Sequence, residues 1–115
     1  MLAAPAFGQD AKTGKSPDGK PYLETPAGMT LYVFDGDGPS GGGSSCYDQC
    51  AKLWPPFAAD AAAKPHDAWT VVKRTDGSMQ WAYKGRPLYA FGKDLAPGQE
   101  NGNAFNGNKW HVAQP

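Results

Sequence analysis

Short stretches in which hydrophobic and polar residues alternate run through most of this chain, separated by Gly, Pro and Asn. Alternation with a period of two is typical of β-strands that bury one face. Residues 30–34 and 79–83 have this pattern, and residues 21–25, 69–73, 87–91 and 109–112 are further predicted strands. A Gly turn joins residues 21–25 and 30–34 into a predicted hairpin, and tight turns join residues 69–73, 79–83 and 87–91 into a predicted antiparallel meander.

Two segments have the composition of short helices instead. Residues 47–53 end before Pro55, which cannot continue a helix, and Ser44 or Ser45 precedes them as a candidate N-cap. Residues 57–64 are Ala-rich and predict one or two helical turns. The expected fold is therefore mainly β with a short helix.

The N-terminal segment resembles a processed leader. Residues 1–8 are small and apolar, and Ala6-Phe7-Gly8 fits the pattern of a signal-peptidase site, so we expect a signal-peptide remnant. Residues 9–20 are polar and predict a leader, which places a single β-rich domain at residues 21–115. Two cysteines in a small exported chain are typical of an oxidising compartment. We therefore expect a periplasmic or secreted protein.

Composition and charge exclude other classes. The 115 residues include 11 basic and 11 acidic side chains, and this balance lacks the basic surface that nucleic-acid binding requires. No apolar stretch approaches the roughly 20 residues of a transmembrane helix. With 4 Trp, 5 Tyr and 5 Phe but no Ile, the core must be built largely from rings.

A short sequence occurs twice in the chain. Residues 31–37 (LYVFDGD) recur 57 residues later as residues 88–94 (LYAFGKD). Each copy follows a Gly turn and precedes a Gly-rich loop that ends in a tryptophan, Trp54 or Trp110. A match that includes its surroundings indicates a duplicated unit. We expect two pseudo-symmetric hairpin or meander repeats, about residues 21–57 and 69–113, that share one core.

The repeated residues have predicted places in that unit. Tyr and Phe are two residues apart in each strand, so their rings point to the same sheet face. The pairs are Tyr32 with Phe34 and Tyr89 with Phe91. We expect these rings in the core, with ligand stacking as the alternative. Asp37 and Asp94 lie just beyond the strands, where they can accept hydrogen bonds from loop N–H groups.

The twin Y-x-[FWY]-x-x-D motifs resemble those of the bacterial secreted-repeat family of predicted lipoproteins. Further marks are the pair Cys46 and Cys50 before Leu53-Trp54-Pro55-Pro56, the segment at residues 80–89 (QWAYKGRPLY) and the closing Trp110-His111-Val112. The resemblance implies an exported, small, β-rich domain of two repeats. It implies no particular biochemical activity.

Cys46 and Cys50 form a C-x₃-C pair. Within a regular helix their Cβ atoms would be too far apart for a disulfide, so a bridge requires Cys46 at or before the helix start. We expect a structural disulfide, with a thiol-redox pair or a copper(I) site as alternatives. Candidates to complete the copper site are His66, His111, Met29 and Met79.

Enzymatic motifs are missing from the sequence. There is no G-x-S-x-G or phosphate-binding Gly loop, and Asp35-Gly36-Asp37-Gly38 fails the calcium-loop spacing. We expect no catalytic residue and no cofactor. The leading interpretation is a non-catalytic exported module that binds a protein or cell-envelope ligand. A periplasmic copper or thiol-redox protein that uses the cysteine pair is the alternative.

Overall fold

The computed structural model describes residues 12–15, 19, 21–37, 43–60, 63–65 and 67–115. The expected signal-peptide remnant lies outside these residues. The described elements are β1 (Lys12–Lys15), β2 (Pro21–Glu24), β3 (Tyr32–Phe34), a 3₁₀ turn (Asp35–Asp37), α1 (Gln49–Leu53), β4 (Trp69–Lys73), β5 (Met79–Tyr83), β6 (Arg86–Pro87), α2 (Phe105–Asn108) and β7 (Trp110–Val112). The protein is therefore mainly β with short helices, as the sequence predicted.

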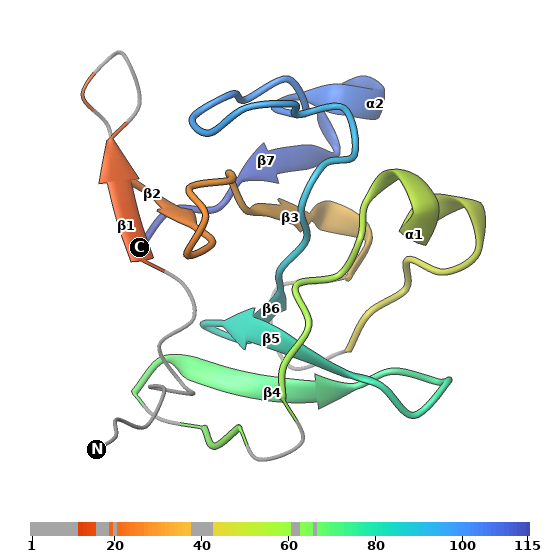
Figure 1. The fold of residues 1–115 in the computed structure, drawn as a ribbon. Coiled ribbons are helices and arrows are strands. Elements are labelled where there is room, and N and C mark those ends of the chain that lie inside the picture. The colour runs from red at the N-terminus through yellow and green to blue at the C-terminus, as the bar shows by residue number, and fades with distance from the viewer. Residues whose placement is uncertain (1–11, 16–18, 20, 38–42, 61–62, 66) are drawn as a thin grey trace.

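The described strands form three small antiparallel sheets, β1–β2, β3–β7 and β4–β5–β6. The predicted meander and last strand are confirmed, although β6 (Arg86–Pro87) has two residues and includes only Pro87 of the expected strand at 87–91. Figure 1 shows β4 and β5 along one side of the molecule and β3 with β7 along the other, and the chain ends beside β1 and β2. The β3–β7 pairing thus joins the first part of the domain to its last strand.

The predicted N-terminal hairpin is only partly correct. The Leu31 N–H does donate to the Leu23 carbonyl (3.0 Å), and Glu24 bridges to Thr30. However, β3 forms its ladder with β7, and β2 forms its ladder with β1. The polar segment that we expected to be a leader therefore contributes a strand.

Residues 57–59, in the first half of the Ala-rich segment, pair with neighbouring strands rather than forming a helix, which corrects the helix predicted there. The Phe57 N–H donates to the Leu88 carbonyl (2.9 Å), and the Phe57 carbonyl accepts from the Trp81 N–H (2.9 Å). Ala59 bonds in the same way to Met79. Pairing with two neighbouring segments outweighs the local helix propensity of alanine, which is a weak preference.

Helix α1 is also shorter than predicted and begins without a serine cap. Asp48 occupies the N-cap position with a positive φ of 56° and no side-chain hydrogen bond to the helix. Ser45 instead binds the Asp37 carboxylate through its N–H and hydroxyl groups, both at 2.7 Å. Ser45 therefore ties the loop to the 3₁₀ turn, and the hydroxyl of Ser44 bonds Tyr89 and Arg74 instead of capping the helix.

Equivalent backbone hydrogen bonds relate the two halves by a pseudo-two-fold axis. At its centre the Tyr32 N–H donates to the Tyr89 carbonyl (2.7 Å), and the Tyr89 N–H donates to the Tyr32 carbonyl (3.0 Å). Further out, the Ala113 N–H donates to Leu31 (2.8 Å) as Phe57 does to Leu88 (2.9 Å). These pairs make β1–β2 the counterpart of β4–β5.

Two hydrophobic clusters lie on opposite faces of the repeated strands. One is largely aliphatic and contains Leu23, Leu31, Val33, Trp81, Leu88 and Ala113. The other is mostly aromatic and contains Tyr32, Cys46, Trp54, Tyr89, Phe91 and Trp110. Period-two alternation explains the division, because Leu31 and Val33 point away from Tyr32. Both clusters draw residues from both repeats.

Candidate functional site

The repeated tyrosines and aspartates are bonded across the pseudo-two-fold axis. Tyr32 of the first repeat donates its hydroxyl hydrogen to Asp94 Oδ2 of the second at 2.6 Å. Tyr89 of the second repeat donates to Asp37 Oδ2 of the first, also at 2.6 Å. Both tyrosines are fully buried, and both aspartates are 7% exposed. Each repeat therefore completes the motif of the other.

The second oxygen of each aspartate accepts a loop N–H, which is the role expected from the sequence. Asp37 Oδ1 accepts from Ser45 (2.7 Å), and Asp94 Oδ1 accepts from Asn101 (3.0 Å). Burial, followed by the hydrogen bond to the aspartate, raises the pKa of Tyr32 and of Tyr89 well above the ordinary value. The hydroxyls therefore remain donors that hold the two loops in place.

The aromatic residues of the motif stack on one another between the two repeats. The rings of Trp54 and Trp110 are parallel, with centroids 3.7 Å apart. Phe91 packs against Trp54, and Phe34 packs against Trp110, each at 4.3 Å. These rings fill the core between the halves, and neither Tyr32 nor Tyr89 is exposed. The geometry favours packing over ligand stacking.

Cys46 and Cys50 form a disulfide, with Cα atoms 5.2 Å apart. Cys46 precedes α1 and Cys50 lies in its first turn, which is the arrangement that a C-x₃-C bridge requires. The bridge joins the Gly-rich loop to the helix that leads into Trp54. The buried Arg74 fixes the same loop by donating to the Cys46 carbonyl (2.6 Å).

The copper alternative finds no ligand set in this arrangement. The disulfide engages both sulfur atoms, and His111 contacts Asp35 instead. Within the described part of the chain, no three or more His, Cys, Asp or Glu side chains cluster in a way that could hold a metal ion. His66 lies outside the described residues. The structure therefore does not favour copper binding.

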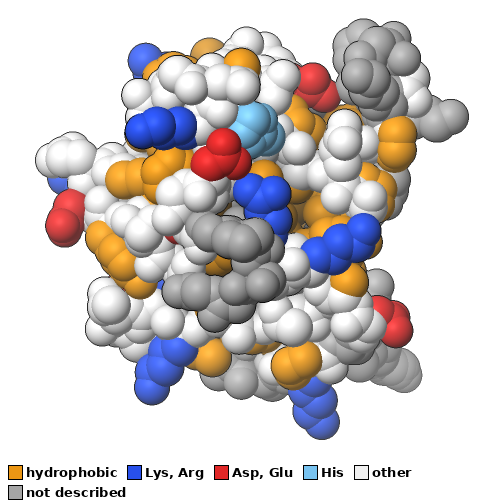
Figure 2. Space-filling view, turned by 180° about the vertical axis from the view of Figure 1, so that it is seen from behind, with side chains coloured by type: hydrophobic (Ala, Val, Ile, Leu, Met, Phe, Trp, Pro, Cys, Tyr) orange, Lys and Arg blue, Asp and Glu red, His pale blue; other side chains and the backbone are white. Residues whose placement is uncertain are grey.

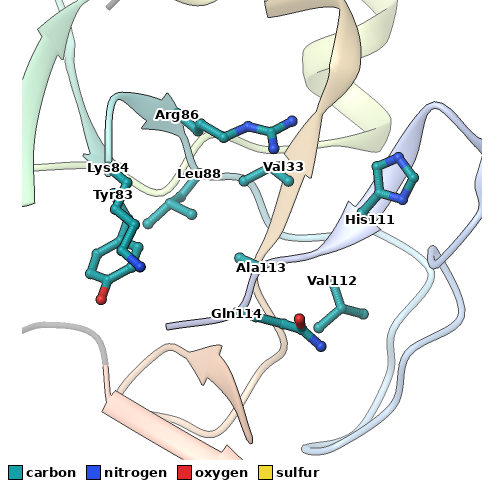
Figure 3. A pocket seen from close by; sticks show the side chains of 9 residues that line it. All are labelled: Val33, Tyr83, Lys84, Arg86, Leu88, His111, Val112, Ala113 and Gln114. Carbon is teal, nitrogen blue, oxygen red and sulfur yellow. The ribbon is translucent and has the colours of Figure 1, made fainter. Parts of the chain in front are cut away.

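A pocket of about 320 Å³ opens on the opposite side of the repeated strands, away from the motif. Its walls come from β3, the β5–β6 turn and the C-terminal strand, as Figure 3 shows. The lining residues are Val33, Tyr83, Lys84, Arg86, Leu88, His111, Val112, Ala113 and Gln114. The volume is at the lower end of the range for small-molecule sites.

Buried apolar residues form the inner part of this pocket. Leu88 is fully buried, and Val33 and Ala113 are 8% and 3% exposed. All three belong to the aliphatic cluster. The floor is therefore an apolar surface that residues of both repeats build.

Charged side chains surround the opening. Asp35 places one carboxylate oxygen 3.0 Å from His111 Nε2 and the other 3.4 Å from Arg86 Nη2. The hydrogen bond from His111 is the main reason that the pKa of Asp35 lies below its ordinary value. In Figure 2 the pale blue imidazole lies beside red and blue side chains on this face. Lys84 adds a further cation at the β5–β6 turn.

The sequence interpretation named His111 only as a copper ligand and did not identify Lys84 or Arg86. The alignment of the two repeats could have identified Arg86 as a candidate site residue. In the aligned repeats Gly28-Met29-Thr30-Leu31 corresponds to Gly85-Arg86-Pro87-Leu88, so a charge replaces an apolar residue at one position. Its proximity to Asp35 and His111 depends on the β3–β7 pairing, which the sequence did not reveal.

The fold and its crossed motif define a duplicated β-rich domain in which two copies of one unit share an aromatic core. A family model described as a secreted repeat of unknown function matches this chain twice, at residues 12–58 and 70–114. The chain belongs to that family. Neither the curated proteins nor the solved structures gave a match. The described residues include no helix that is long and apolar enough to cross a bilayer.

Proposed function

We propose that this protein is a non-catalytic exported module that binds a protein or cell-envelope ligand in the pocket between β3, the β5–β6 turn and the C-terminal strand. The observation that carries the proposal is the combination of a buried apolar floor with basic side chains at the opening. Sites for small ligands typically have this composition, with few polar groups that fix orientation.

The chemistry of the lining supports binding rather than catalysis. His111 and Asp35 form a hydrogen-bonded pair, but no Ser, Thr or Cys lines the described pocket to act as a nucleophile beside them. Acyl transfer requires such a nucleophile within reach of the base. Arg86 and Lys84 are suited to holding an anion in place.

The covalent structure supports a location in the periplasm. The family is one of secreted repeats. The disulfide of Cys46 and Cys50 suits an oxidising compartment outside the cytoplasm. A ligand in that compartment would be an envelope component or another exported protein.

The experiment is an NMR titration of the isotope-labelled protein with soluble cell-wall fragments, lipopolysaccharide and peptides. We expect saturable shifts at the amides of Lys84, Arg86 and His111. The variant Arg86→Met, which installs the residue of the first repeat, should weaken binding at least tenfold. Lys93→Met is the matched control, because Lys93 is exposed and does not line the pocket.

Two results would overturn the proposal. Shifts that are saturable but lie elsewhere, with Arg86→Met binding normally, would place the ligand site on another surface. Absence of any shift with a folded protein, across all three ligand classes, would remove the binding function from this pocket.

A further inference from the structure

The pseudo-symmetry gives the pocket an equivalent place in the other repeat, where a larger side chain stands. Ala113 and Phe57 make matching hydrogen bonds, each donating to a repeat leucine and accepting from a strand N–H. Their side chains differ by a whole ring, and Phe57 packs against the aliphatic cluster on its own side. The small Ala113 therefore leaves open the space that a phenylalanine fills in the other repeat.

The charged residues at the opening follow the same asymmetry. Arg86 corresponds to Met29, and the β3–β7 ladder makes His111 the counterpart of Pro55. Asp35, whose N–H donates to the Lys109 carbonyl, corresponds to Gly92, whose N–H donates to Leu53.

The equivalent place in the other repeat has the same backbone hydrogen bonds but holds Met29, Pro55 and Gly92, none of which carries a charge. Scaffold stability does not explain why Arg86, His111 and Asp35 gather beside this pocket.

From this asymmetry, and resting on the proposed function, we infer that the pocket binds the terminal carboxylate of a peptide that ends in a small apolar residue. The carboxylate bonds to Arg86, with Lys84 adding attraction. The small side chain lies on the floor of Leu88, Val33 and Ala113.

The charges at the opening favour an anion. Lys84 and Arg86 carry two positive charges, and Asp35 offsets one of them. A guanidinium has five N–H donors, whereas Asp35 engages Nη2 at a long 3.4 Å. Asp35 therefore engages one of these donors, and the remaining donors on the terminal nitrogens can bond a second carboxylate.

The geometry around Arg86 points to a carboxylate among the possible anions. Asp35 engages Arg86 through Nη2 alone, so the described residues place no carboxylate across both terminal nitrogens of the guanidinium. Planar, two-point recognition is the particular property of arginine with carboxylates. Figure 3 shows the Arg86 guanidinium and the His111 ring near Val33, with Ala113 further into the pocket.

The size of the pocket limits the ligand. About 320 Å³ is roughly the space of ten water molecules at ~30 Å³ each. Such a space accommodates a small terminal residue together with its carboxylate. Proteins and cell-wall stem peptides both supply small apolar termini with a free carboxylate.

The test uses the full chain and two synthetic peptides, N-acetyl-L-Ala-L-Ala and N-acetyl-D-Ala-D-Ala, each compared with its C-terminal amide by NMR titration. We expect at least one acid to bind the pocket at least tenfold more tightly than its amide. Preference for the L,L peptide would assign a protein terminus, and preference for the D,D peptide a cell-wall peptide.

Substitutions in the pocket make the test specific. Ala113→Phe should abolish peptide binding while the fold survives, because Phe57 occupies the equivalent place. Arg86→Met should weaken acid binding at least tenfold, and Lys93→Met should leave it unchanged. Asp35→Asn should strengthen acid binding several-fold, since it removes the competing negative charge.

Several outcomes would overturn the inference. These are equal binding of acid and amide, normal binding by a folded Ala113→Phe variant, or no binding of either peptide. If Ala113→Phe does not fold, Arg86→Met decides instead. The ratio of its affinities for the acid and for the amide is then compared with that of the wild type, and an unchanged ratio would overturn the inference. Should another envelope ligand shift the pocket amides while neither peptide does, the carboxylate assignment fails and the proposed function stands.

Discussion

Tyr32 and Tyr89 each supply a hydroxyl to an aspartate that belongs to the other repeat. Each bond joins a neutral donor to a buried carboxylate, and hydrogen bonds of this kind are about twice as strong as those between neutral groups. The aspartates in turn fix the loops through Ser45 and Asn101. The twin motif is therefore a structural lock, and each half of it acts in the opposite repeat.

Replacing either tyrosine by phenylalanine should destabilise the fold. Tyr32→Phe and Tyr89→Phe each remove a donor from a buried carboxylate, so we expect a loss of roughly 1.5–3 kcal/mol in the free energy of unfolding. Urea denaturation followed by tryptophan fluorescence measures it. Tyr47→Phe is the control, because the Tyr47 hydroxyl accepts only an exposed hydrogen bond from Thr75 (3.2 Å). Equal stability of all three variants would contradict the lock.

The same tyrosines predict alkaline destabilisation. Their pKa values in the folded protein are raised above 10.0, so the native state keeps protons that the unfolded chain loses. This stabilisation is complete below pH 10 and is lost as the pH rises further. The free energy of unfolding should fall by about 1.4 kcal/mol per pH unit for each tyrosine. Urea midpoints measured between pH 8 and pH 11.5 test this.

Tyr32→Phe serves as the control for the pH series. One titrating group is then missing, and the slope above pH 10 should become shallower, while Tyr89 and Tyr22, whose pKa burial also raises, still contribute. A wild-type protein whose stability stays flat through this range would show that these hydroxyls ionise alike in both states.

Strands β1 and β4 show how the elements of the two repeats can correspond when their sequences do not. Thr13 pairs with Leu23 as Val71 pairs with Trp81. The first strand is nevertheless a polar KTGK, whereas the second is WTVVK. Hydrogen-bond register, not side-chain pattern, makes them equivalents.

The disulfide acts on a single element of the fold, because it fixes the loop that leads into α1. Breaking it in the variant Cys46→Ala/Cys50→Ala should lower the free energy of unfolding by about 2 kcal/mol, the chain-entropy value for a five-residue loop. Urea unfolding with and without a reductant measures the loss. Reductant should destabilise the wild type equally and leave the double variant unaffected, and a reductant effect on the double variant would contradict this assignment.

Sequence patterns predicted some of these elements well and missed others for physical reasons. Strands β4, β5 and β7 have clear alternation, and the repeated LYxF segments placed Tyr32 and Tyr89 in the core. Strand β1 has no apolar alternation to detect. At Phe57 tertiary pairing with Leu88 overrode helix propensity, which no local pattern can reveal.

The candidate pocket could not be predicted from sequence patterns for a related reason. Its charged residues lie far apart along the chain, and only the β3–β7 ladder brings Asp35 to His111. The repeat alignment does expose Arg86 as a departure from Met29, but not what it faces.

At the scale of the whole molecule, neither repeat has a complete core. Trp54 of the first repeat stacks on Trp110 of the second, and β3 finds its ladder partner in β7. The aliphatic cluster also mixes residues from both. A unit that can bury its hydrophobic face only against a neighbour is unstable alone.

Cutting the chain between the repeats tests this dependence. Separate fragments of residues 1–62 and 63–115 should each lack fixed tertiary structure at low micromolar concentration. Mixing them should restore the near-ultraviolet circular dichroism of the stacked tryptophans. A fragment that is both monomeric and folded would contradict the shared core, and NMR dispersion with sedimentation analysis would reveal it.

The crossing of the tyrosines has a further consequence for how such a domain could originate. An arrangement in which each half gives and receives the same contacts is the geometry of an isologous homodimer. A chain with one repeat would find in a second copy every partner that Tyr32 and Asp37 find here in the other half. Joining the copies makes that encounter intramolecular and independent of concentration. It also frees the two formerly identical surfaces to diverge, and Arg86 beside Ala113 is the outcome on one of them.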